Sequence, residues 1–95
     1  MKTSKIKEIA NIIIFIKDLK KTEIAERCSF SYTTLTGFLT RHSKMLFENM
    51  EELFDVLDFP FLVALKLAEK HYNRKELIEK VLLEIKEIEL LKEQQ

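Results

Sequence analysis

The chain of 95 residues is 46% hydrophobic and 34% charged, and it contains a single glycine and a single proline. So few turn-forming residues leave little room for strands and hairpins, and the composition therefore predicts an all-α domain with a small core. The net charge is zero, but residues 1–44 carry nine basic and four acidic side chains, whereas residues 45–95 carry seven basic and twelve acidic ones.

The first expected helix runs from about Ser4 to Leu19. Its apolar residues recur every three to four positions, as in a helix that buries one face: Ile6, Ile9, Ile12, Ile13 and Ile16. Ile14 and Phe15 fall off this face, and we expect the C-terminal helices to cover them. The apolar run at residues 12–16 is too short to span a bilayer and is flanked by charges, so we expect no membrane segment and a cytoplasmic protein.

Residues 20–40 are interpreted as two short helices joined by a tight turn. Ile24 and Ala25 give the first helix its apolar stripe, and Leu35, Phe38 and Leu39 give one to the second. Ser31 is placed to cap the second helix, because its hydroxyl can accept a hydrogen bond from a free N–H of the first turn. The exposed face of that helix would then carry short hydroxyl groups and one aromatic ring, which suits entry into a DNA major groove.

This stretch resembles the helix-turn-helix of lambda-repressor-like (Cro/XRE-type) regulators, and residues 46–59 resemble the fourth helix of that family. The resemblance covers roughly residues 5 to 60. Ser29 stands where the family usually has the turn glycine. A serine in a left-handed conformation costs about 1 kcal/mol, so we expect a distorted turn at this position. Lys20 and Lys21 replace the usual hydroxyl cap and glutamine.

The resemblance implies two sets of DNA contacts. The expected base contacts come from Ser31, Tyr32, Thr33, Thr36, Gly37 and Thr40. The expected phosphate contacts come from Lys20, Lys21, Thr22, Arg41, Ser43 and Lys44. The alternative for residues 41–44 is a merely solvated loop.

The second half of the chain predicts three more helices, at about residues 46–57, 61–72 and 74–93. Pro60 separates the first two, because proline disfavours a helical conformation in the residue before it. Asn73 and Glu76 have the form of a capping box at the start of the last helix. This helix is long for the family's compact domain, and we expect its apolar stripe to pair two copies of the chain: Leu77, Ile78, Val81, Leu82, Ile85, Ile88 and Leu91.

The expected architecture is thus a compact bundle of about five helices with a repressor-type helix-turn-helix, plus the longer C-terminal helix. Residues 1–60 would form the DNA-binding domain, and residues 61–95 would complete the core and form the dimer. The charge separation, +5 in the first half against −5 in the second, fits a DNA face opposed to a partner face. The alternative to this functional interpretation is that two solvated surfaces happen to differ in charge.

The remaining residues suggest no catalytic site. A single cysteine, Cys28, excludes an internal disulfide and a cysteine-based metal cage. The sequence lacks a glycine-rich phosphate loop and a nucleophile elbow, so we expect no enzyme, no cofactor and no metal. We therefore expect a homodimeric regulator that binds double-stranded DNA, most simply a repressor of the phage or mobile-element kind. The alternative is a protein-interaction module, antitoxin-like or an inhibitor, that binds a protein partner through its acidic C-terminal half.

Overall fold

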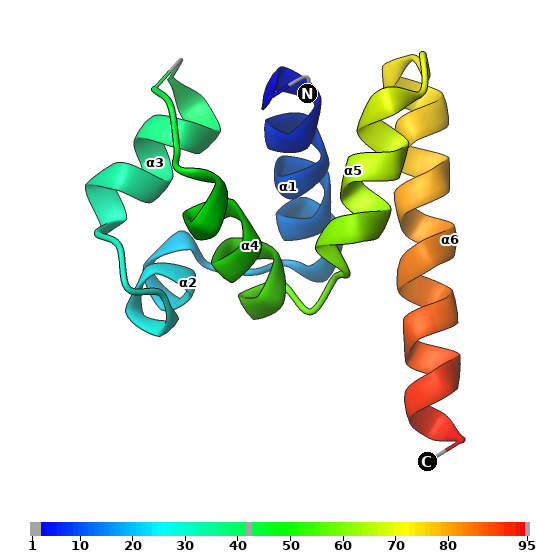
Figure 1. Ribbon diagram of the computed structural model, residues 1–95. Helices are drawn as coiled ribbons and strands as arrows, with labels where there is room; N and C mark the ends of the chain where they lie inside the picture. Colours follow the sequence, from blue (N-terminus) through cyan, green and yellow to red (C-terminus); the bar gives the residue numbers. More distant parts are fainter. Residues whose placement is uncertain (1–2, 42, 95) are drawn as a thin grey trace.

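Six α-helices and their short connections account for residues 3–41 and 43–94, which are the residues described by the computed structural model (Figure 1). They are α1 (Thr3–Lys17), α2 (Lys21–Arg27), α3 (Tyr32–Thr40), α4 (Phe47–Val56), α5 (Phe61–Glu69) and α6 (Arg74–Glu93). The predicted all-α architecture with a longer C-terminal helix is confirmed. Within these residues, no helix is both long and apolar enough to cross a membrane.

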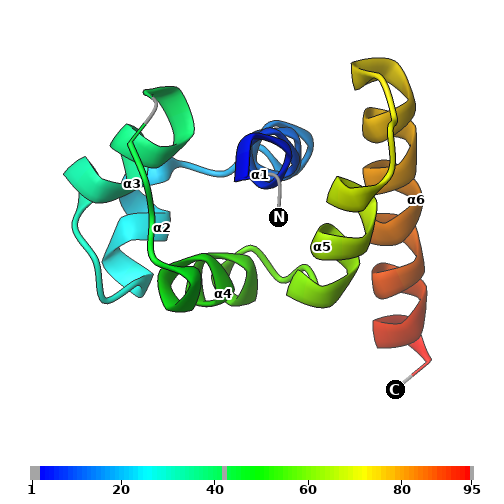
Figure 2. The same cartoon turned by 45° about the horizontal axis from the view of Figure 1, so that its top comes forward.

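Helix α1 lies in the middle of the molecule. It packs against α3 on one side and against α5 and α6 on the other, as both views show (Figures 1 and 2). All six helices contribute to one hydrophobic cluster, so residues 61–94 share their core with the segment before them. Every buried residue that the structure describes is apolar or glycine. The isoleucine run in α1 is therefore explained by its central position.

One face of α1 stays open to solvent. Ser4 and Phe15 are exposed along it, and Glu8 and Asn11 are half-buried between them, at the spacing of one helical stripe. The expectation that both Ile14 and Phe15 are covered is therefore wrong for Phe15, which is 86% exposed, while Ile14 is buried. The reason is the direction of the two side chains, because successive residues of a helix point about a quarter turn apart.

Helices α1 and α4 end in the same way. Asp18 and Asp58 adopt left-handed conformations, with φ of 52° and 57°. The next residue in each case donates its backbone N–H to a carbonyl five positions back, from Leu19 to Ile14 and from Phe59 to Phe54. This is the Schellman arrangement, in which glycine is the usual left-handed residue. The first helix therefore ends at Lys17, earlier than the predicted Leu19.

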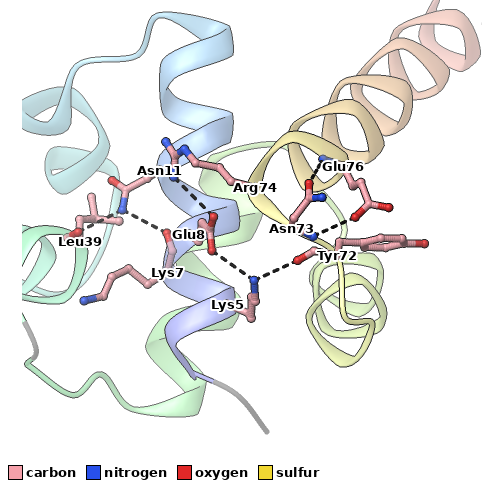
Figure 3. A network of polar contacts seen from close by, with 9 residues as sticks. All are labelled: Lys5, Lys7, Glu8, Asn11, Leu39, Tyr72, Asn73, Arg74 and Glu76. Carbon is pink, nitrogen blue, oxygen red and sulfur yellow. Dashed lines mark hydrogen bonds and ion pairs between the residues drawn. The ribbon is translucent and has the colours of Figure 1, made fainter.

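The start of α6 is tied to the start of α1 (Figure 3). The predicted capping box is present: Asn73 Oδ1 accepts from the Glu76 N–H at 2.9 Å, and Glu76 Oε1 accepts from the Asn73 N–H at 3.1 Å. Lys5 Nζ donates to the Tyr72 carbonyl at 3.2 Å, and Arg74 pairs with Glu8 at 3.4 Å. These contacts set the register in which α6 lies along α1.

Candidate nucleic-acid interface

Helices α2 and α3 form a consecutive pair at the end of the molecule opposite α6 (Figure 1). They pack on each other, and they are also held from behind, because α3 contacts α1 and α2 contacts α4. Ile24 of α2 is buried, as are Leu35, Phe38 and Leu39 of α3. These are the apolar stripes expected from the sequence, and they leave the opposite side of α3 facing solvent.

The link between the two helices is held by a carboxylate of α4. The backbone N–H of Ser29 donates to Glu52 Oε1 at 3.0 Å, and the Ser29 hydroxyl donates to the same oxygen at 2.7 Å. Ser29 is not among the residues with positive φ. The turn therefore differs from the left-handed one that a glycine would form, in line with the expected distortion. Cys28, at the end of α2, is in an extended conformation (φ −106°, ψ 158°), and the chain turns without a left-handed residue at Ser29.

The thiol of Cys28 lies within this link. Burial raises its pKa, and the nearby Glu52 carboxylate raises it further, because both disfavour a thiolate. The thiol is therefore protonated and weakly nucleophilic around neutral pH, which argues for a packing role at the end of α2.

The exposed face of α3 carries one aromatic ring and several hydroxyl groups. Ser31 caps the helix as predicted, since its Oγ accepts from the Thr34 N–H at 3.1 Å. Tyr32 is 48% exposed, and Thr33 and Thr40 are exposed as well, whereas Thr36 is half-buried. The helix contains no charged residue. Five of the six predicted base-contacting residues therefore remain at least partly accessible at or along α3.

Gly37 is the exception, and its assignment as a base contact is wrong. It is buried, because the chain returns over α3 after Arg41. A Cβ added at this position would lie 3.2 Å from Ser43 Oγ and 3.3 Å from Ser43 Cβ. The only glycine of the chain thus allows the loop after α3 to pass close to the helix, as small residues do where two backbones approach.

The predicted phosphate-binding residues lie at the two ends of this helix pair. Lys20 precedes α2, Lys21 and Thr22 begin it, and all but the half-buried Lys21 are exposed. Arg41, Ser43 and Lys44 are exposed in the loop that follows α3. Lysine and arginine side chains at these positions provide positive charge without sequence preference.

Two polar residues of α1 donate hydrogen bonds to the C-terminal end of α3, a role that the sequence analysis did not predict. Lys7 Nζ donates to the Arg41 carbonyl at 2.9 Å, and Asn11 Nδ2 donates to the Leu39 carbonyl at 3.0 Å (Figure 3 shows the second contact). Free carbonyls at a helix end need such donors. The sequence held a signal for Asn11, which is the only polar residue in the otherwise apolar run of residues 9–16.

Helix α6 presents a different surface from the one expected. Leu77, Val81 and Ile85 are buried inside the chain, where α6 packs along α1, so their assignment to a dimer interface is wrong. Ile88 is half-buried against the α4–α5 junction. The apolar residues of α6 that remain exposed are Ile78, Leu82, Leu83, Leu90 and Leu91, with exposed fractions from 36% to 61%.

An acidic hollow of about 350 Å³ lies at the α4–α5 junction. Its lining combines three carboxylates with apolar side chains: Glu51, Asp55, Asp58, Phe59, Pro60, Phe61 and Ile88. Asp58 also pairs with Lys92 of α6, and this hydrogen bond lowers the pKa of the Asp58 carboxyl. This surface is acidic, whereas Lys20, Arg41 and Lys44, which flank the helix pair, are basic.

Comparison of the chain with family models, with curated proteins and with solved structures finds no match.

Proposed function

We propose that this chain is a sequence-specific regulator that binds double-stranded DNA by inserting α3 into the major groove, in the manner of lambda-repressor-like helix-turn-helix proteins. The observation that supports the proposal is the distribution of side chains on the two sides of α3. One side is anchored through Leu35, Phe38 and Leu39, and the other exposes hydroxyls and a tyrosine ring without a single acidic group. A rigid helix with a slim, uncharged outer face fits a groove lined by phosphates.

The basic residues at both ends of the helix pair would supply the affinity. Lys20 and Lys21 precede or begin α2, and Arg41 and Lys44 follow α3, so cations flank the proposed recognition helix. Contacts of this kind fix the position of a protein on DNA and make its binding salt-dependent. The acidic hollow at the α4–α5 junction would be turned away from the phosphates. As a repressor, the bound protein would act by occupying the site.

A fluorescence anisotropy titration with duplexes from the DNA that flanks its own gene tests this function. We expect competitor-resistant binding that weakens with salt. Lys21→Ala or Arg41→Ala should weaken binding to every sequence and lower the salt slope by about one for each lost phosphate contact. Thr33→Ala should instead relax base preference. Lys66→Ala removes the same charge from α5, which lies on the other side of α1 from α3, and should leave binding unchanged. Equal behaviour of all these variants would refute the docking.

We further propose that the exposed apolar residues of α6 pair two copies of the chain. Leu83 and Leu90 lie seven residues apart on one face of the helix and are 55% and 56% exposed. Two copies would then present two recognition helices to half-sites about one helical turn apart. Light scattering should show a dimer for the wild-type chain and a monomer for Leu83→Glu/Leu90→Glu. Removal of α6 is unsuitable, because it would uncover the core that Leu77 and Val81 complete.

The acidic hollow favours a second candidate, a protein-interaction module. Glu51, Asp55 and Asp58 line it together with aromatic side chains, a combination that suits a basic partner with an apolar anchor. Co-purification of a protein that is lost with Glu51→Lys/Asp55→Lys, in a chain that does not bind DNA, would favour this candidate over the first.

A further inference from the structure

The exposed face of α3 lacks charged and amide side chains. None of its residues is Arg, Lys, Asn, Gln, Asp or Glu. These are the side chains that make bidentate or accepting contacts with base edges: Arg or Lys with guanine, Asn or Gln with adenine, and Asp or Glu with cytosine. What remains toward solvent is the Tyr32 ring and a set of threonines.

Two threonines on this face already use their hydroxyl hydrogens within the protein. Thr36 Oγ1 donates to the Tyr32 carbonyl at 3.0 Å, and Thr40 Oγ1 donates to the Thr36 carbonyl at 2.7 Å. Ser31 and Thr34 share a hydrogen bond at 3.1 Å. For Thr36 and Thr40, the groups left for a ligand are therefore an oxygen lone pair and the methyl group.

A threonine whose hydroxyl hydrogen is bonded to its own helix can still contact thymine through its methyl group. In the major groove, the apolar group of a base pair is the C5-methyl of thymine, and threonine methyls are among its usual contacts. Guanine presents two acceptors there, and it would need a donor that Thr36 and Thr40 have committed to their own backbone. The part of α3 that carries Thr36 and Thr40 thus matches A·T pairs better than G·C pairs.

We propose that α3 reads A·T-rich half-sites through thymine methyl groups, with Thr36 and Thr40 as residues that determine this specificity. The inference rests on the proposed DNA-binding function and adds the class of sequence recognised. The basic residues around α3 then contribute affinity on all sequences, and discrimination comes from methyl contacts that exclude guanine.

The test is a selection of binding sites from a randomised duplex library with the full chain, followed by base replacement in the selected site. We expect an A·T-rich half-site. Deoxyuridine keeps every hydrogen-bonding edge of thymine but lacks its methyl, so replacing a contacted thymine should weaken binding about fourfold. Duplexes with deoxyuridine outside the protected half-site are the matched control and should bind as before.

Two substitutions at one position separate the methyl from the hydroxyl. Thr36→Ser keeps the hydroxyl and should abolish the deoxyuridine effect at one thymine, whereas Thr36→Val keeps the methyl and should preserve it. A selected half-site with an invariant G·C pair under α3, or full affinity for the deoxyuridine duplexes, would overturn this inference and leave DNA binding intact. A selection that enriches no motif would overturn the proposed function itself, and this inference with it.

Discussion

Glycine substitutions at two turns test how this chain reverses direction. At Ser29 the structure shows no positive φ but a hydroxyl bonded to Glu52 at 2.7 Å. At Asp18 it shows φ of 52° with no hydrogen bond or ion pair from the side chain among the described residues. Ser29→Gly should therefore destabilise the protein, and Asp18→Gly should stabilise it, although the family resemblance alone would place the need for glycine at Ser29.

The magnitudes follow from the contacts. Ser29→Gly removes one exposed hydrogen bond to a carboxylate, about 0.5–1.5 kcal/mol, and adds the entropy of glycine in the unfolded chain, about 0.5 kcal/mol. Asp18→Gly relieves a left-handed non-glycine residue and should gain about 0.5–1 kcal/mol. For a domain of this size, 1 kcal/mol corresponds to about 4–8 °C in Tm. The two variants should thus melt on opposite sides of the wild type.

Thermal unfolding followed by far-UV circular dichroism measures both shifts. Ser29→Ala should lie between Ser29→Gly and the wild type, because it loses the hydroxyl without the added entropy. A double-mutant cycle of Ser29→Ala with Glu52→Ala should give a coupling of about 0.5–1.5 kcal/mol, and Glu51→Ala on the same helix should show none with Ser29. A Ser29→Gly variant that melts at or above the wild-type temperature would refute the role assigned to Glu52.

Three further outcomes are expected. Leu77→Ala should lower the free energy of unfolding in urea by about 2–5 kcal/mol, because Leu77 is fully buried, whereas Leu62→Ala on the exposed side of α5 should change it by less than about 0.5 kcal/mol. Lys92→Gln should cost about 0.2–1 kcal/mol near neutral pH. That difference should vanish in acid. The pKa of Asp58 is lowered in the folded protein, so the charged carboxylate stabilises the fold above the ordinary pKa of 3.8, and this stabilisation is lost as the pH falls through the pKa of the folded state. A difference independent of pH would contradict the pairing. Cys28 should react with iodoacetamide more slowly in the native than in the unfolded chain, because burial and then a neighbouring carboxylate raise its pKa, and equal rates would disprove this.

The sequence by itself determined the helices and where several of them begin. Ser31 and Asn73 cap α3 and α6 as their side chains predict, because capping depends on neighbours three residues away. Pro60 separates α4 from α5 for an equally local reason. The DNA contacts inferred from the same stretch stay a prediction, since their partner is a molecule that neither the sequence nor the fold contains.

Only the tertiary structure determined which residues are covered by distant parts of the chain and which remain exposed. Gly37 is buried because the loop carrying Ser43 returns over it, and Phe15 is exposed because no helix packs on its side of α1. Three of the seven apolar residues of α6 that were predicted to form a dimer interface are instead buried in the core, beginning with Leu77. The turn at Ser29 is held by a glutamate 23 residues away. Periodicity shows that a face is apolar, but the packing of distant segments determines what covers it.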